Sequence, residues 1–118
     1  MARHIKTGEL GEQLAMEYFL KKGFTILHQN WRHSHWEVDI IASQNEVLHF
    51  IEVKTRRTKT FGHPEEDVSK KKILNLINAS EEFLHLHPQW VRIQFDILSI
   101  NLLNNAEPEY FLIEDVYV

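Results

Sequence analysis

Hydrophobic positions near the start of the chain recur at helical spacing. Gly23 follows this stretch directly and is a common helix stop signal. Intervals of three and four residues place apolar side chains on one face of a helix. The pattern predicts an amphipathic helix over residues 7–22, with an inner face formed by Leu10, Leu14, Ala15, Tyr18 and Phe19.

Residues 36–54 show a strand pattern instead. Two arms rich in β-branched and aromatic residues flank a turn-forming stretch at 43–46, which predicts an antiparallel hairpin. If the turn centres on residues 45 and 46, Asp39 lies opposite Glu52 and Glu37 opposite Lys54, with Cβ atoms about 5 Å apart. A slip of one residue in register would move the acids to opposite faces.

Charged residues interrupt the second arm, which is mostly apolar on both faces. A strand buried on both faces is an unfavourable place for unpaired charge. Two carboxylates as close as Asp39 and Glu52 repel each other unless a cation lies between them, and a divalent cation with oxygen ligands meets that need. Lys54 on the same face could hold a phosphate oxygen or a water molecule, which favours metal-assisted phosphodiester hydrolysis. The alternative is that these are ordinary solvated or ion-paired charges.

The remaining pattern predicts further strands and a second helix. Residues 55–64 are polar and predict a loop, and Ser69 is a candidate N-cap for a helix that starts between 65 and 69 and ends by Pro88. The expected additional strands are 24–30, 91–100 and, at a sheet edge, 110–118. This order predicts an α/β fold, with a mixed central sheet of about five strands flanked by two main helices, in a single domain over residues 1–118.

Composition excludes several classes of protein. The chain has 118 residues, is 43% hydrophobic and contains no cysteine, so disulfide scaffolds, thiolate zinc sites and thiol nucleophiles are excluded. No apolar run approaches the roughly 20 residues needed to cross a bilayer, and we expect a cytoplasmic protein without membrane contact. The histidine pairs at 33/35 and 85/87 lack the ligands that would complete a zinc set, and are interpreted as loop histidines.

Charge is distributed unevenly. The formal net charge is −4, yet seven of the thirteen Lys and Arg residues fall between positions 54 and 72. Such a basic cluster could bind phosphates, although a solubilising surface is an equal alternative. The candidate nucleic-acid-binding residues are Arg56, Arg57, Lys59 and Lys72.

Glu12 lies beside the buried stripe of the first helix, not opposite it. Its carboxylate could therefore reach the metal site or orient a water molecule there. The alternative is a boundary residue paired with a nearby cation.

Over nearly its full length the chain resembles the YraN-like family of uncharacterised bacterial proteins. Single motifs are short, and their order and spacing together carry the resemblance. The matching segments are GELGE (8–12) with Ala15, Gly23, NWR (30–32), EVDIIA (37–42), FIEVKTR (50–56), FG (61–62), Val68 with Lys72, and FD (95–96).

That family is similar to the restriction-endonuclease-like (PD-(D/E)xK) nuclease superfamily, including Holliday-junction resolvases. The resemblance implies that Asp39 and Glu52 bind a metal, with the Val53 carbonyl as a third ligand. It also implies that Lys54 is the catalytic lysine and Glu12 a helix-borne catalytic acid. Trp36 departs from the pattern, because a small glycine is expected there, and its indole would narrow access to the site.

These features lead to three hypotheses. The first is a nuclease that uses Mg²⁺, with Mn²⁺ as a substitute, to cut DNA, including branched or structured forms; RNA stays open as a substrate. The second is a catalytically silent nucleic-acid-binding module in a repair, recombination or uptake assembly. The third is a protein–protein adaptor in which the acids and Lys54 form a salt-bridge network. A resolvase would need two sites and therefore a homodimer.

Overall fold

The structure, a computed structural model, describes residues 7–57, 69–104 and 106–116. Within them the chain forms one five-stranded sheet in the order β1-β2-β3-β4-β5. Strands β3 and β4 are parallel and the other neighbours are antiparallel, so the predicted α/β fold with a mixed sheet is confirmed. The elements are α1 (Thr7–Lys21), β1 (Thr25–His33), β2 (Trp36–Gln44), β3 (Val47–Arg56), α2 (Lys70–Leu86), β4 (Arg92–Asn101) and β5 (Glu109–Ile113).

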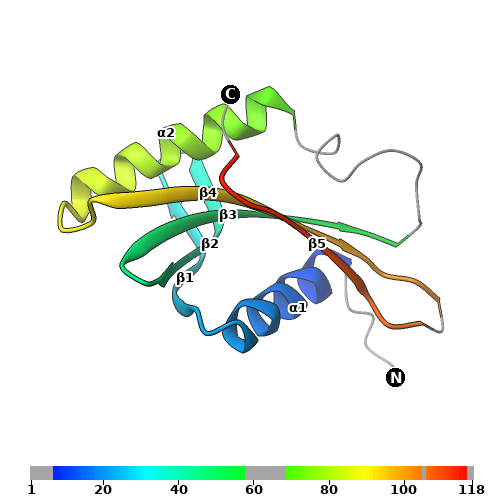
Figure 1. The fold of residues 1–118 in the computed structure, drawn as a ribbon. Coiled ribbons are helices and arrows are strands. Elements are labelled where there is room, and N and C mark those ends of the chain that lie inside the picture. Colours follow the sequence, from blue (N-terminus) through cyan, green and yellow to red (C-terminus); the bar gives the residue numbers. More distant parts are fainter. Residues whose placement is uncertain (1–6, 58–68, 105, 117–118) are drawn as a thin grey trace, which may run out of the picture.

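The two helices cover opposite faces of the sheet (Figure 1). The apolar stripe of α1 packs against one face, where Phe19, Ile51 and Leu98 are fully buried. Helix α2 links the parallel strands β3 and β4 and covers the other face, where Phe83 contacts the cluster that contains Phe50. Side chains of a strand alternate between faces, so odd and even positions of β3 face different helices.

Close approach of α1 to the sheet depends on Gly11. A Cβ atom at this position would overlap the side chain of Thr55 on β3, so only glycine allows the helix to lie this close. The contact brings the first turns of α1 next to the C-terminal half of β3. Glu12 is thereby held near that part of the sheet.

The hairpin of β2 and β3 has the predicted register. Ile40 lies opposite Ile51 and Gln44 opposite Val47, which centres the turn on Asn45 and Glu46. Both turn residues have positive φ, 52° and 66°, as a two-residue hairpin turn matching strand twist requires. Turn composition therefore sufficed to set the register of this hairpin.

Several predicted boundaries need correction. Strand β1 does not end at residue 30 but continues to His33, because residues 31–33 pair with 36–38 of β2. Strand β3 extends through Thr55 and Arg56, which pair with β4 and do not begin the loop. Arg57 forms a bend after the strand, and residues 58–64 of the predicted loop lie outside the described residues.

The other predicted elements agree with the structure. Ser69 is the N-cap of α2, and its side chain accepts a hydrogen bond from the Lys72 N–H at 3.3 Å. Strand β5 is an edge strand, although it spans only Glu109–Ile113. Neither helix is long and apolar enough to span a membrane, as far as the described ranges go.

Candidate active site

Strands β2 and β3 separate at one end of the hairpin. Their pairing stops at Ile40 and Ile51. Beyond that point β2 pairs only with β1, and β3 pairs only with β4. The two strands thus open a fork in the middle of the sheet.

Both predicted cross-strand pairs lie beyond the end of the ladder. Asp39 and Glu52 still line one cavity. Glu37 was expected opposite Lys54, but this pairing does not form because the ladder ends before it. Glu37 instead pairs with Arg32 across the β1–β2 ladder, and their charged groups lie 3.4 Å apart. Both side chains are largely exposed, so this ion pair contributes little stability.

Asp39 stands where the strands separate. Its Oδ2 accepts a hydrogen bond of 2.7 Å from the backbone N–H of Val53, so the side chain replaces a backbone partner in the ladder. Metal binding by the Val53 carbonyl stays a prediction.

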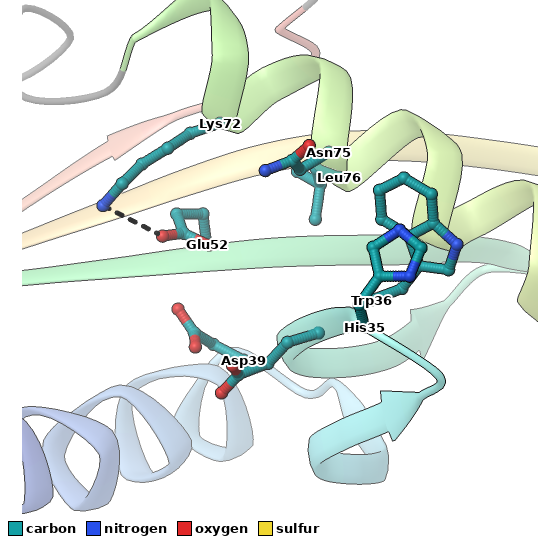
Figure 2. A pocket seen from close by; sticks show the side chains of 8 residues that line it. His35, Trp36, Asp39, Glu52, Lys72, Asn75 and Leu76 are labelled. Carbon is teal, nitrogen blue, oxygen red and sulfur yellow. Dashed lines mark ion pairs between the residues drawn. The ribbon is translucent and has the colours of Figure 1, made fainter.

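A cavity of about 320 Å³ lies over the fork, between the sheet and α2. Figure 2 shows Glu52 of β3 between Asp39 of β2 and Lys72 of α2, so three elements meet here. The lining residues are His35, Trp36, Glu37, Asp39, Glu52, Lys72, Asn75 and Leu76.

Burial perturbs both carboxylates of this cavity. The pKa of Asp39 is raised, mainly by burial; the hydrogen bond from Val53 opposes this rise, and the charges of Glu37 and Glu12 add to it. Burial and the charge of Asp39 raise the pKa of Glu52 from 4.5 to about 7. Because burial and neighbouring negative charge disfavour ionisation of both acids, a cation at this site would stabilise their charged forms.

Lys72 supplies a positive charge at this site. Its Nζ lies 3.8 Å from Oε1 of Glu52, and its charge lowers the pKa of that carboxyl, against the larger effect of burial. It was predicted as a phosphate-binding residue of the basic cluster. The structure adds a direct contact with a site carboxylate, whereas phosphate binding stays a prediction.

Lys54 follows Glu52 by two residues and shares its face of β3. It does not line the cavity, and within the described ranges it forms no hydrogen bond or ion pair. A salt-bridge network centred on Lys54 is therefore not observed among those residues. Its ammonium group remains available to a ligand, and its catalytic role stays a prediction.

Glu12 approaches the site from α1. Its Oε2 accepts a hydrogen bond of 3.2 Å from the Asn30 amide, and its charge contributes to the raised pKa of Asp39. The partner is a neutral amide, which differs from the cation expected for a simple boundary residue. Glu12 is close enough to act electrostatically on Asp39 without lining the cavity.

The predicted nucleic-acid-binding residues continue along β3 beyond the fork. Arg56 donates a hydrogen bond of 3.2 Å to Oδ1 of Asn101, and Arg57 donates one of 2.6 Å to the Thr7 hydroxyl. Both acceptors are neutral. Lys59 lies outside the described residues.

Sequence analysis missed part of the cavity. His35 was interpreted as a loop histidine, yet it lines the cavity beside Trp36. Asn75 was not noticed, although positions 72, 75 and 76 have the spacing that places them on one helix face. No group of three or more His, Cys, Asp or Glu side chains suited to a metal is found in the part of the chain that the structure describes.

The fold and site define a small α/β protein with a carboxylate site in a sheet fork. Residues 11–100 match the Uncharacterised protein family UPF0102, and the chain belongs to this family. A UPF0102 protein of Bacteroides thetaiotaomicron is 38% identical over 85% of this chain and 83% of its own length. Those of Clostridium perfringens and Christiangramia forsetii are 36% and 38% identical, covering 93% and 99% of this chain and 92% and 98% of their own lengths.

Proposed function

We propose that this protein is a Mg²⁺-dependent nuclease that hydrolyses phosphodiester bonds in DNA. The main support is the half-buried pair of Asp39 and Glu52 at the fork, whose pKa values are raised by partial burial and by neighbouring negative charge. Perturbed acids in a cavity are a common mark of a functional site. Resemblance to the restriction-endonuclease-like superfamily, with its Asp…Glu-x-Lys core, is part of the same proposal.

The donor groups suit a hard cation. Asp39, Glu52 and the Val53 carbonyl offer oxygen only, and Mg²⁺ and Mn²⁺ prefer oxygen ligands. Sites of this kind usually hold Mg²⁺ through one or two carboxylates and leave the other positions to water and substrate phosphate. When bound, Mg²⁺ would supply Lewis-acid activation of water and neutralise charge on the phosphate.

The remaining residues would act on substrate and water. In hydrolysis the water oxygen forms a new bond to phosphorus, the bond to the leaving oxygen breaks, and the leaving oxygen takes up a proton. Lys54 would donate hydrogen bonds to the attacking water or to the phosphate oxygens, where negative charge develops. Lys72 would bind a neighbouring phosphate, and Glu12 would orient water from the α1 side.

A nucleic-acid-binding module that cuts nothing is the second candidate. One observation favours it: Lys72 already balances part of the charge of Glu52 at 3.8 Å, so the acids have a protein partner without a metal. Such a module would bind DNA with strong salt dependence, because phosphate contacts release counterions. It would show no dependence on divalent metal.

Cleavage assays separate the two candidates. Wild-type protein is incubated with Mg²⁺ and labelled single-stranded, duplex, flapped and four-way DNA, beside Asp39→Asn, Lys54→Ala and the control Glu46→Gln at the distant hairpin turn. We expect cleavage by wild type and control, none by Asp39→Asn, and a loss of about 10²- to 10³-fold in Lys54→Ala, comparable to removal of one charge-stabilising donor. Equal cleavage by all four proteins would contradict the nuclease proposal.

A further inference from the structure

Part of the cavity over the fork is lined by residues that have no proposed role in metal binding. Figure 2 shows the carboxylates and Lys72 at one end and the rings of His35 and Trp36 together at the other. Asn75 and Leu76 project from α2 between these ends. A volume of about 320 Å³ is near the lower end of the range for small-ligand sites, roughly 300 to 1,000 Å³.

The aromatic end is an accessible surface with a fixed position. The rings of His35 and Trp36 have centroids 4.1 Å apart, His35 is exposed and Trp36 is partly buried. Trp36 also packs against the apolar cluster under α2, which holds the indole from behind. Flat, rigid rings of this kind are the usual platform for stacking a nucleobase.

One turn of α2 presents three different chemical groups to the cavity. Positions 72, 75 and 76 share a helix face and bring an ammonium group, an amide and an aliphatic side chain. Asn75 is exposed, and its amide forms no hydrogen bond with other residues of the described ranges. A free amide offers both a donor and an acceptor, which suits the edge of a base.

Glu37 is the one lining group that would oppose a nucleotide at this end. Its carboxylate lies 3.4 Å from Arg32, so a cation outside the cavity offsets part of its charge. Its side chain is 48% exposed, and water screens what remains. The base-facing surface is therefore formed mainly by rings, the amide and Leu76.

We propose that this half of the cavity receives one unpaired nucleobase, stacked on His35 and Trp36 and hydrogen-bonded by Asn75, while its phosphate lies at the carboxylate end. A base inside a duplex is stacked and paired and cannot enter such a pocket without being extruded. The substrate class is therefore DNA with an unpaired nucleotide at the site of cutting, such as a single strand or a flap. The placement of the phosphate rests on the proposed nuclease function, whereas the stacking of the base does not.

The test compares binding of a short fluorescent oligodeoxynucleotide with binding of its blunt duplex. Ca²⁺ replaces Mg²⁺ in these measurements, since it also takes oxygen ligands. Trp36→Ala should weaken single-strand binding by about 5- to 100-fold, the range found when a base-stacking aromatic is removed. Trp36→Phe should retain most of the affinity, and binding of the duplex should change by less than about twofold.

Two further variants guard against a misfolded Trp36→Ala protein. Asn75→Ala changes an exposed helix position where alanine favours the helix, and should still weaken single-strand binding by about fivefold, as expected when one hydrogen bond is removed. Trp90→Ala is the matched control, because Trp90 lines a separate cavity beside the β2–β3 turn. Unchanged single-strand affinity in both Trp36→Ala and Asn75→Ala, or an equal loss for duplex, would overturn the proposal.

A Mn²⁺ titration of the same variants separates this inference from the nuclease proposal. Trp36→Ala should bind Mn²⁺ as wild type does, because the indole is not a ligand. Metal binding with no preference for single strands would refute the base pocket alone. A preference that depends on Trp36, in a protein that binds no metal, would refute the nuclease and keep the base pocket.

Discussion

The carboxylates of this sheet differ in how many protein groups contact them. Asp96 on β4 is 1% exposed. Its Oδ2 lies 2.6 Å from Nδ1 of His49, and its Oδ1 accepts hydrogen bonds from the Gln94 amide at 2.9 Å and the Asp115 N–H at 3.0 Å. Every one of these partners belongs to the chain itself, so this carboxylate is satisfied without a ligand.

The carboxylates at the fork have fewer partners. Asp39 accepts one backbone hydrogen bond, and Glu52 has a lysine nitrogen at 3.8 Å. Burial and neighbouring negative charge raise the pKa of both acids, although a hydrogen bond between the two side chains lowers the pKa of Asp39. Burial is therefore common to both sets of acids, whereas a shortage of protein donors distinguishes the carboxylates at the fork from Asp96.

Removing the satisfied acid should have the largest effect on stability. Asp96→Ala leaves a buried histidine and two donors without their acceptor, so we expect the free energy of unfolding to fall by about 3–5 kcal/mol. Urea denaturation measures this change. Asp39→Asn is the counterpart, because the amide oxygen can still accept the Val53 hydrogen bond, and its effect should stay within about 1 kcal/mol. A decrease below about 1 kcal/mol in Asp96→Ala would remove the distinction between the two acids.

The pH dependence of the free energy of unfolding should reflect the raised pKa of Glu52 at the fork. Because the pKa of Glu52 is about 7 in the folded protein and 4.5 ordinarily, the folded state holds this proton more tightly. The resulting stabilisation is fully present below about pH 4.5 and is lost as pH rises toward about 7. Glu52→Gln should lack this loss and be more stable than wild type above that pH by about 1–3 kcal/mol. Parallel stability–pH curves for the two proteins would contradict the raised pKa.

The smallest effect is expected from the cations that follow the site on β3. Changing Arg56 and Arg57 together to Ala should reduce the slope of log affinity for DNA against log salt by about 0.9 for each phosphate that the variant no longer neutralises. Fluorescence anisotropy at several salt concentrations gives this slope. Lys21 and Lys22 at the other end of α1 provide a control of equal charge, and an equal change there would place the binding surface elsewhere.

Local signals in the sequence predicted the hairpin and its register. The turn at Asn45 and Glu46 correctly set the pairing of the two strands as far as Ile40 and Ile51, and Asp39 and Glu52, which follow directly beyond it, line one cavity. The point at which β2 and β3 stop pairing could not be predicted from these local signals, because it depends on β2 pairing with β1 and β3 with β4. For that reason the contact between Glu37 and Lys54 was predicted and is not formed.

Long-range contacts account for the rest of what the sequence did not reveal. The strand pattern did not indicate that Asp96 is buried, which follows from the central place of β4, between β3 and β5. Its contact with His49 joins residues 47 positions apart. Likewise, Lys72 and Asn75 reach the fork because of how α2 packs on the sheet, which helical periodicity alone does not determine.

We propose that the acids at the fork bind a divalent cation. Calorimetric titration with Mn²⁺ at about pH 8, above the pKa of about 7 of Glu52, tests it on wild type, Asp39→Asn and Glu46→Gln. The last of these removes an exposed carboxylate at the far end of the same hairpin. We predict saturable binding by wild type and Glu46→Gln and its loss in Asp39→Asn. Equal binding by all three proteins, or no binding by wild type up to millimolar Mn²⁺, would contradict the claim.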